Sequence, residues 1–117
     1  MLTFECLTVD AVNPARLAEF WAQLLEWSTH VDDDGAVWIE PPGGGPDILF
    51  LTSTDERHGK NRLHLDLRPD DRDAEVARAL ALGATHVDIG QDGTETWVVL
   101  ADPEGNEFCI LRALPEA

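Results

Sequence analysis

The spacing of apolar residues along the chain changes several times, and each change marks a predicted element. Residues 2–9 alternate between apolar and polar positions and are rich in β-prone types, which predicts a strand. From Pro14 to Trp27 the apolar residues recur at helical spacing, with Asn13 suited to the N-cap and Pro14 to the first turn. The rest of this half predicts a turn at 32–35, a strand at 36–39, a Pro/Gly loop at 41–46 and a strand at 48–52.

The same succession of patterns begins again after a polar stretch at residues 53–61. Residues 62–68 alternate strictly and predict a strand. A helix follows over residues 71–82, capped by Asp70 or Asp71 and ended by Gly83. Two further strands and a turn followed by a last strand complete this half, at residues 85–89, 95–100 and 102–111.

The element order is therefore strand–helix–strand–strand–strand, present twice. A weak echo supports an internal duplication, because the pattern that starts at Asp10 recurs 56 residues later at Asp66. We expect an α+β fold of two paired βαβββ modules, the first over about residues 1–53 and the second over about 61–113. A chain of 117 residues is too short for two independent cores, so both modules are expected to form one domain over residues 1–117.

The charge balance narrows the classes of partner. The chain carries 23 acidic and 8 basic residues, a net charge of −15, which disfavours binding to nucleic acid or to an anionic membrane surface and attracts cations. No apolar run approaches the roughly 20 residues of a membrane span, and residues 1–5 lack the features of a secretory signal. Two cysteines are too few for a disulfide framework, so the cytoplasm is the expected compartment.

Four stretches carry a resemblance to a known family. They are Asn13-Pro-Ala-Arg-Leu-Ala-Glu-Phe-Trp21, Lys60-Asn-Arg-Leu-His-Leu-Asp-Leu-Arg68, Ala81-Leu-Gly-Ala84 and Asp102-Pro-Glu-Gly-Asn106. Together they resemble small glyoxalase-like proteins of the vicinal oxygen chelate (glyoxalase/bleomycin resistance/dioxygenase) superfamily. The resemblance implies the paired-module fold and a homodimer, but it leaves the activity open, because the superfamily includes isomerases, dioxygenases, lyases, thiol transferases and antibiotic-sequestering proteins.

The resemblance also implies where a metal would bind. In metal-using members the first and last strands of each module each donate one ligand, and the four ligands meet inside a cup formed by the curved sheet. The corresponding positions here are Cys6 or Thr8, Ile48 or Phe50, His64, and Cys109 where glutamate is usual. Only one of the four positions, His64, keeps a usual ligand type, so we expect no hard-metal site and no cofactor. A divalent zinc ion on Cys6, His64 and Cys109 is the alternative.

The predicted strand around His64 places a polar row toward that cup. Arg62, His64, Asp66 and Arg68 alternate with leucines, so their side chains share one face. One interpretation is that His64 binds a ligand or transfers protons while Asp66 orients it, which makes these two the candidate catalytic residues. Arg62 and Arg68 would then contact the ligand. The other interpretation is a structural row whose members satisfy one another.

Four further residues complete the predicted ligand-binding set. Trp38 lies on a short strand before the Pro/Gly loop and is the candidate for stacking on a ligand. Phe50, Glu107 and Cys109 belong to the strands that the resemblance places at the cup, and Glu107 could supply a carboxylate by a change of register. We expect a protein that binds or sequesters a small cationic or aromatic molecule. A lyase or isomerase of the glyoxalase type, using His64 with or without a divalent metal, is the alternative, and whether the protein is an enzyme stays open.

Overall fold

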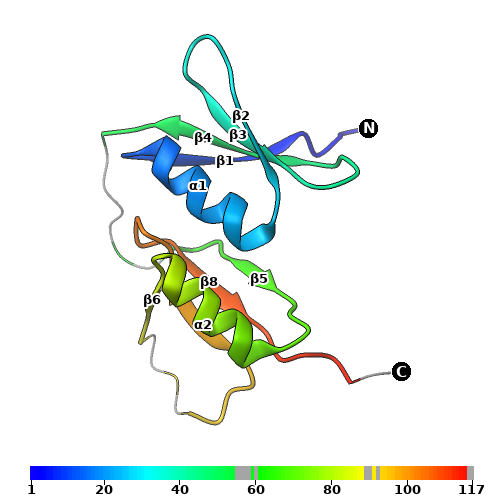
Figure 1. The fold of residues 1–117 in the computed structure, drawn as a ribbon, viewed down its shortest axis with the longest axis vertical. Helices are drawn as coiled ribbons and strands as arrows, with labels where there is room; N and C mark the ends of the chain where they lie inside the picture. Colours follow the sequence, from blue (N-terminus) through cyan, green and yellow to red (C-terminus); the bar gives the residue numbers. More distant parts are fainter. Residues whose placement is uncertain (55–58, 60, 89–90, 92, 116–117) are drawn as a thin grey trace. The chain divides into compact units, whose positions relative to one another are not determined.

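Each half of the chain folds as a four-stranded sheet with one helix against it (Figure 1). The computed structural model describes residues 1–54, 59, 61–88, 91 and 93–115. These residues fall into two units, Met1–Glu56 and Arg57–Ala117. The polar stretch predicted at 53–61 and the turn predicted around Asp92 lie partly outside the described residues.

The first unit has a sheet in strand order β1-β4-β3-β2. β1 is parallel to β4, and the other neighbours are antiparallel. Its elements are β1 (Cys6–Ala11), α1 (Pro14–Leu25), β2 (Ser28–Val31), β3 (Val37–Glu40) and β4 (Asp47–Thr52).

The second unit repeats this topology with strand order β5-β8-β7-β6. β5 is parallel to β8, and the remaining pairs are antiparallel. The elements are β5 (Leu65–Leu67), α2 (Arg72–Leu82), β6 (Thr85–His86), β7 (Val98–Ala101) and β8 (Glu107–Ile110). The repeated order of elements and the matching sheet orders confirm the predicted α+β fold of two βαβββ modules.

Both helices begin with side-chain caps, as their sequences predict. The Asn13 side chain accepts a hydrogen bond from the Arg16 amide at 3.2 Å, which satisfies one of the unpaired donors of the first turn. The second helix is capped by Asp71 rather than Asp70, since Asp71 accepts from the Ala74 amide at 3.1 Å. The first helix ends at Glu26, whose φ of 60° lies in the left-handed region.

The core of the first unit lies on one face of its sheet. Ile39 and Phe50 have no exposed surface, whereas Trp38 and Leu49, which alternate with them, are half-buried. Since side chains alternate between faces along a strand, the buried row is the face that α1 covers. Phe50, predicted to contact a ligand, lies on this buried face, and Leu49 lies on the other face of β4; the ligand contact of Phe50 stays a prediction.

Two predicted strands begin later than their sequence patterns suggest. β1 starts at Cys6 instead of residue 2, because its ladder partner β4 starts at Asp47, directly after Pro46, which has no amide to donate. β5 covers Leu65–Leu67 instead of residues 62–68. The segment that precedes β5 is bonded to the turn before β8 instead, because the Asn61 side chain donates a hydrogen bond to the Asn106 side chain at 3.1 Å.

The exposure of Leu63 follows from this late start of β5. The residue is 85% exposed, although the strand predicted over residues 62–68 would have included it. Strands β6 and β7 are likewise shorter than the predicted ranges. Among the described residues, no helix is long and apolar enough to cross a membrane.

Candidate functional site

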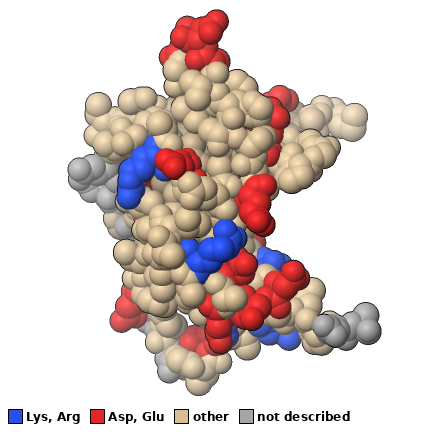
Figure 2. Space-filling view, in the orientation of Figure 1, with Lys and Arg blue, Asp and Glu red and all other residues tan. Residues whose placement is uncertain are grey.

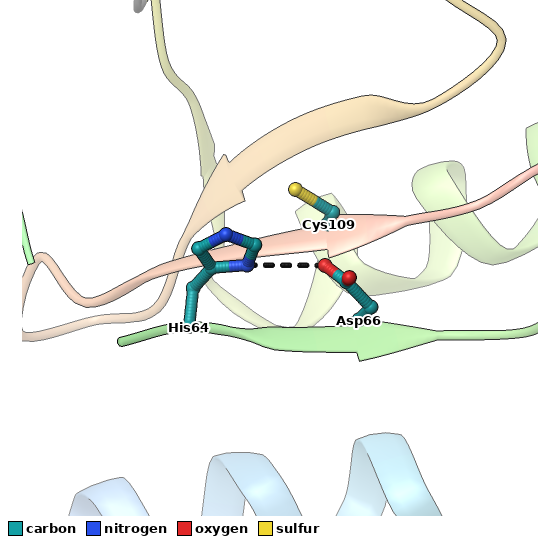
Figure 3. Close-up of side chains that lie close together, drawn as sticks. All are labelled: His64, Asp66 and Cys109. Atoms are coloured by element: carbon teal, nitrogen blue, oxygen red, sulfur yellow. Dashed lines mark ion pairs between the residues drawn. The ribbon is translucent and has the colours of Figure 1, made fainter. Parts of the chain in front are cut away.

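A cluster of three polar side chains lies on the face of the second sheet opposite α2. The imidazole of His64, the carboxylate of Asp66 and the thiol of Cys109 point toward one another (Figure 3). His64 directly precedes β5, Asp66 lies on β5 and Cys109 lies on β8. His64 Nδ1 and Asp66 Oδ1 are 3.0 Å apart. One donor atom from each of the three residues lies within 4.8 Å of the other two.

The register of the sheet brings the cluster together. In the parallel pairing of β5 with β8, Asp66 lies beside Cys109. His64 precedes Asp66 by two residues, so its side chain emerges on the same face. The neighbours Leu65 and Phe108 are paired on the opposite face, and Phe108 is 1% exposed beneath α2. The three polar side chains therefore share the face opposite the one that Leu65 and Phe108 occupy.

The turn before β8 sets the position of Cys109. The Asp102 carboxylate accepts hydrogen bonds from the amides of Glu104 and Asn106 at 2.9 and 3.0 Å, and also from the Asn106 side chain. Gly105 has a φ of 89°, which a side chain would strain. Through Asn106 the turn also bonds to Asn61, three residues before His64. The same turn therefore anchors both strands that carry the cluster.

The cluster is partly open to solvent. The side chains of His64 and Asp66 are 38% and 51% exposed, whereas Cys109 is buried, with 8% exposed. A carboxylate at Nδ1 orients the imidazole and favours a proton on that nitrogen, which leaves Nε2 able to accept a proton or bind a ligand. The arrangement can therefore serve for ligand binding, for proton transfer or for holding a metal ion.

The other residues predicted for this face have separate partners. Arg68 Nη1 donates to the Arg112 carbonyl at 2.6 Å, so Arg68 bonds to the main chain while His64 and Asp66 bond to each other. Arg62 is exposed in a bend before β5. Glu107 is buried, with 7% exposed, and its Oε2 accepts from the Asn61 amide at 3.4 Å. Glu107 is not part of the cluster, and its role in ligand binding stays a prediction.

Cys6 and Thr8 lie on β1 in the first unit. The Cys6 Sγ and Thr8 Oγ1 atoms are 3.7 Å apart, so both side chains occupy the same face of that strand. Cys6 and Thr8, the two alternatives for the first metal ligand, therefore lie on the same face of β1. A site that joins Cys6 to His64 and Cys109 stays a prediction.

Trp38 belongs to a second polar cluster, on the open face of the first sheet. Its ring stacks on that of His30, with centroids 5.5 Å apart and planes at 16°. Its Nε1 donates to Glu40 Oε1 at 3.0 Å, and His30 Nε2 lies 3.3 Å from Glu40 Oε2. Sequence reasoning missed His30 and Glu40. The hairpin predicted around residues 32–35 could have indicated this cluster, because its register pairs His30 with Trp38.

The family of the chain follows from its sequence, and its fold agrees. Paired βαβββ modules are the fold that this chain shares with a solved structure of the glyoxalase/bleomycin resistance protein/dioxygenase family. The model of the glyoxalase-like domain family matches residues 6–111, so the chain belongs to that family. A sequence search of curated proteins found no match.

Solved structures support the same fold. A glyoxalase/bleomycin resistance protein/dioxygenase family enzyme from Burkholderia phytofirmans PsJN superposes with a TM-score of 0.75 at 20% identity, covering 97% of this chain and 100% of that one. FosX, a fosfomycin resistance protein of Listeria monocytogenes solved with Mn(II) and 1S,2S-dihydroxypropylphosphonic acid, gives 0.74 at 12% identity, covering 97% and 92%. TnmS3, an antibiotic binding protein from Streptomyces sp. CB03234, gives 0.67 at 17%, covering 97% and 98%.

Proposed function

We propose that the protein binds a small organic molecule at the His64–Asp66–Cys109 cluster and holds it without chemical change. The observation that carries this proposal is the convergence of three chemically different side chains, of which His64 and Asp66 are partly exposed to solvent. Such convergent polar groups are typical of sites that orient a ligand. The description of one similar structure as an antibiotic binding protein supports the class of function, although not the ligand.

The charge of the chain favours a cationic ligand. Acidic side chains are spread over the face shown in Figure 2, where basic side chains are few, in keeping with the net charge of −15. Asp66 places a half-exposed carboxylate within the cluster itself. A planar cation would meet both a negative field and a fixed negative charge. Trp38 stays a separate candidate for aromatic contact, on the first unit.

A fluorescence titration with the cationic dye acridine orange tests this proposal. The protein is kept in chelator, so that a metal does not contribute, and the anionic dye 8-anilinonaphthalenesulfonate serves as the opposite-charge probe. We expect the cationic dye to bind more tightly. The Asp66→Asn variant should lose affinity about five-fold, corresponding to about 1 kcal/mol for an exposed ion pair.

The Asp70→Asn variant is the matched control, because it removes the same charge from an exposed position outside the cluster. Equal weakening by the two variants would mean that the dye responds to the overall charge of the chain. Equal affinity for the two dyes would contradict a preference for cations. Either result rejects the cluster as a binding site for cationic molecules.

A second candidate function is supported by the bond between His64 Nδ1 and Asp66 Oδ1. A carboxylate that orients an imidazole at 3.0 Å is a common arrangement for a general acid or base. The protein would then be a lyase or isomerase of the glyoxalase type. Each ligand that binds is incubated with stoichiometric protein and then analysed by mass spectrometry and chromatography. Recovery of unchanged ligand supports binding alone, whereas conversion that disappears in His64→Gln supports the enzyme.

The proposed setting is the cytoplasm, and the proposed assembly is a homodimer. Cys6 and Cys109 form no disulfide in the structure, which accords with a reducing compartment. The dimer is proposed from the family resemblance, and its test is given among the predictions below.

A further inference from the structure

The His64–Asp66–Cys109 cluster brings three kinds of metal-binding atom to one place in a single unit. The imidazole nitrogen, carboxylate oxygen and sulfur lie within 4.8 Å of one another. Within the described residues, this is the one group of three or more His, Cys, Asp or Glu side chains whose donor atoms come so close. His64 and Asp66 are exposed enough for an ion to reach them from solvent.

The spacing of the donors is close to that of a tetrahedral ion site. Zinc bonds of about 2.0–2.3 Å at tetrahedral angles place the donor atoms about 3.3–3.7 Å apart. His64 Nδ1 and Asp66 Oδ1 are closer than this, at 3.0 Å, and the widest separation is at most 4.8 Å; zinc bound through Nδ1 would take the place of the proton that this nitrogen shares with Asp66. The widest separation would have to shorten by about 1 Å for one zinc ion to bind all three donors.

The donor types favour zinc over harder ions. A thiolate is a soft ligand, which suits zinc and does not suit magnesium or manganese, for which several oxygen ligands are preferred. The cluster supplies one carboxylate. The nearest further carboxylate on β8, that of Glu107, is buried and accepts a hydrogen bond from the Asn61 amide. The residues therefore do not fit the hard-metal site of metal-using relatives.

We propose that His64, Asp66 and Cys109 bind one zinc ion through a three-ligand site that leaves the fourth position open. All three ligands come from the second unit, so the site differs from the sequence-based alternative that includes Cys6. The open position would accept water or an oxygen, nitrogen or sulfur atom of a small molecule. The inference shares its side chains with the proposed function, but metal binding needs no organic ligand.

Zinc affinity is measured by competition with a chromophoric chelator, and the ligands are identified by replacing zinc with cobalt(II). We expect one equivalent of zinc and a sulfur-to-cobalt charge-transfer band. Loss of supporting groups around a metal commonly costs 10–100-fold in affinity, so loss of a ligand in Cys109→Ser or His64→Gln should cost about 100-fold. Cys109→Ser should also remove the charge-transfer band.

Matched controls make the assignment specific. Cys6→Ser removes the other thiol, and Asp70→Asn removes an exposed carboxylate outside the cluster, so both should bind zinc as the wild type does. His64 is exposed, so His64→Gln is expected to fold even if Cys109→Ser, at a buried position, does not; circular dichroism verifies each variant. Loss of zinc binding in Cys6→Ser would overturn the single-unit site. Absence of binding by the folded wild type at micromolar zinc would overturn the proposal altogether.

The two proposals can fail separately. The dye titration is done in chelator and therefore reports on organic ligands alone, whereas the zinc titration contains no dye. Zinc binding without dye binding would leave the metal site standing and reject the proposed ligand class. The reverse result would reject the metal site and leave the proposed function standing.

Discussion

Replacing Asp102 tests whether the turn before β8 stabilises the second unit. The side chain is almost fully buried, with the residue 3% exposed. Its carboxylate accepts bonds from two backbone amides, those of Glu104 and Asn106, and from the Asn106 side chain. In Asp102→Ala these donors lose a charged acceptor inside a tight turn.

The expected loss follows from the number of bonds. Each bond to a charged group contributes about 1.5–3 kcal/mol, and water can replace part of this, because Glu104 and Asn106 are half-buried. We therefore expect the free energy of unfolding to fall by about 2–4 kcal/mol. Asp102→Asn, which keeps one acceptor oxygen, should lose about half as much.

Urea unfolding followed by circular dichroism measures the change, and hydrogen exchange read by mass spectrometry locates it. With an m-value of about 2 kcal/mol per molar urea, the midpoint should fall by about 1–2 M. Exchange should rise in peptides from residues 93–115 and 61–68, which the turn links through Asn61. A loss below about 0.5 kcal/mol in Asp102→Ala, or faster exchange confined to residues 1–54, would refute the reasoning.

Four shorter predictions follow from other parts of the structure. Asn13→Ala removes the cap on the Arg16 amide and should cost about 1 kcal/mol by urea unfolding, whereas Asn13→Ser should cost much less. Glu26→Gly should stabilise by up to about 1 kcal/mol, because glycine adopts the left-handed conformation without strain, and Glu26→Ala should bring no gain. Phe50→Ala should cost about 3–5 kcal/mol, as for a core residue; a cost below about 1 kcal/mol would restore the ligand-facing placement. Light scattering at micromolar concentration should give the mass of a homodimer, and a monomer mass would contradict that expectation.

Local sequence predicted the helices and turns well, because their signals lie within a few residues. The cap at Asn13 and the end of the second helix at Gly83 each depend on contacts within one turn of the chain. The hairpin around residues 32–35 needs a tight turn between two short strands. The fold class follows from the repetition of this local order.

The candidate site was predicted in part. Alternation along the chain put His64 and Asp66 on one face, and the structure keeps them there. The same alternation could not tell which face of β4 is covered by α1, and the structure places Phe50 on that covered face. Arg68 was expected to join the row, but it bonds to the main chain of Arg112.

By itself, the sequence determined the order of elements, their capping and the pairing of two similar modules, since periodicity and turn chemistry are local properties. The tertiary structure decided which side chains meet. Asp66 lies beside Cys109 because β5 and β8 pair in one register, and His30 meets Trp38 because β2 and β3 do. A shift of one residue would turn each of these side chains to the other face. The register of β5 against β8 depends on packing between residues far apart in the chain, so no local pattern could specify it, whereas the turn at 32–35 is a local signal for the pairing of β2 with β3.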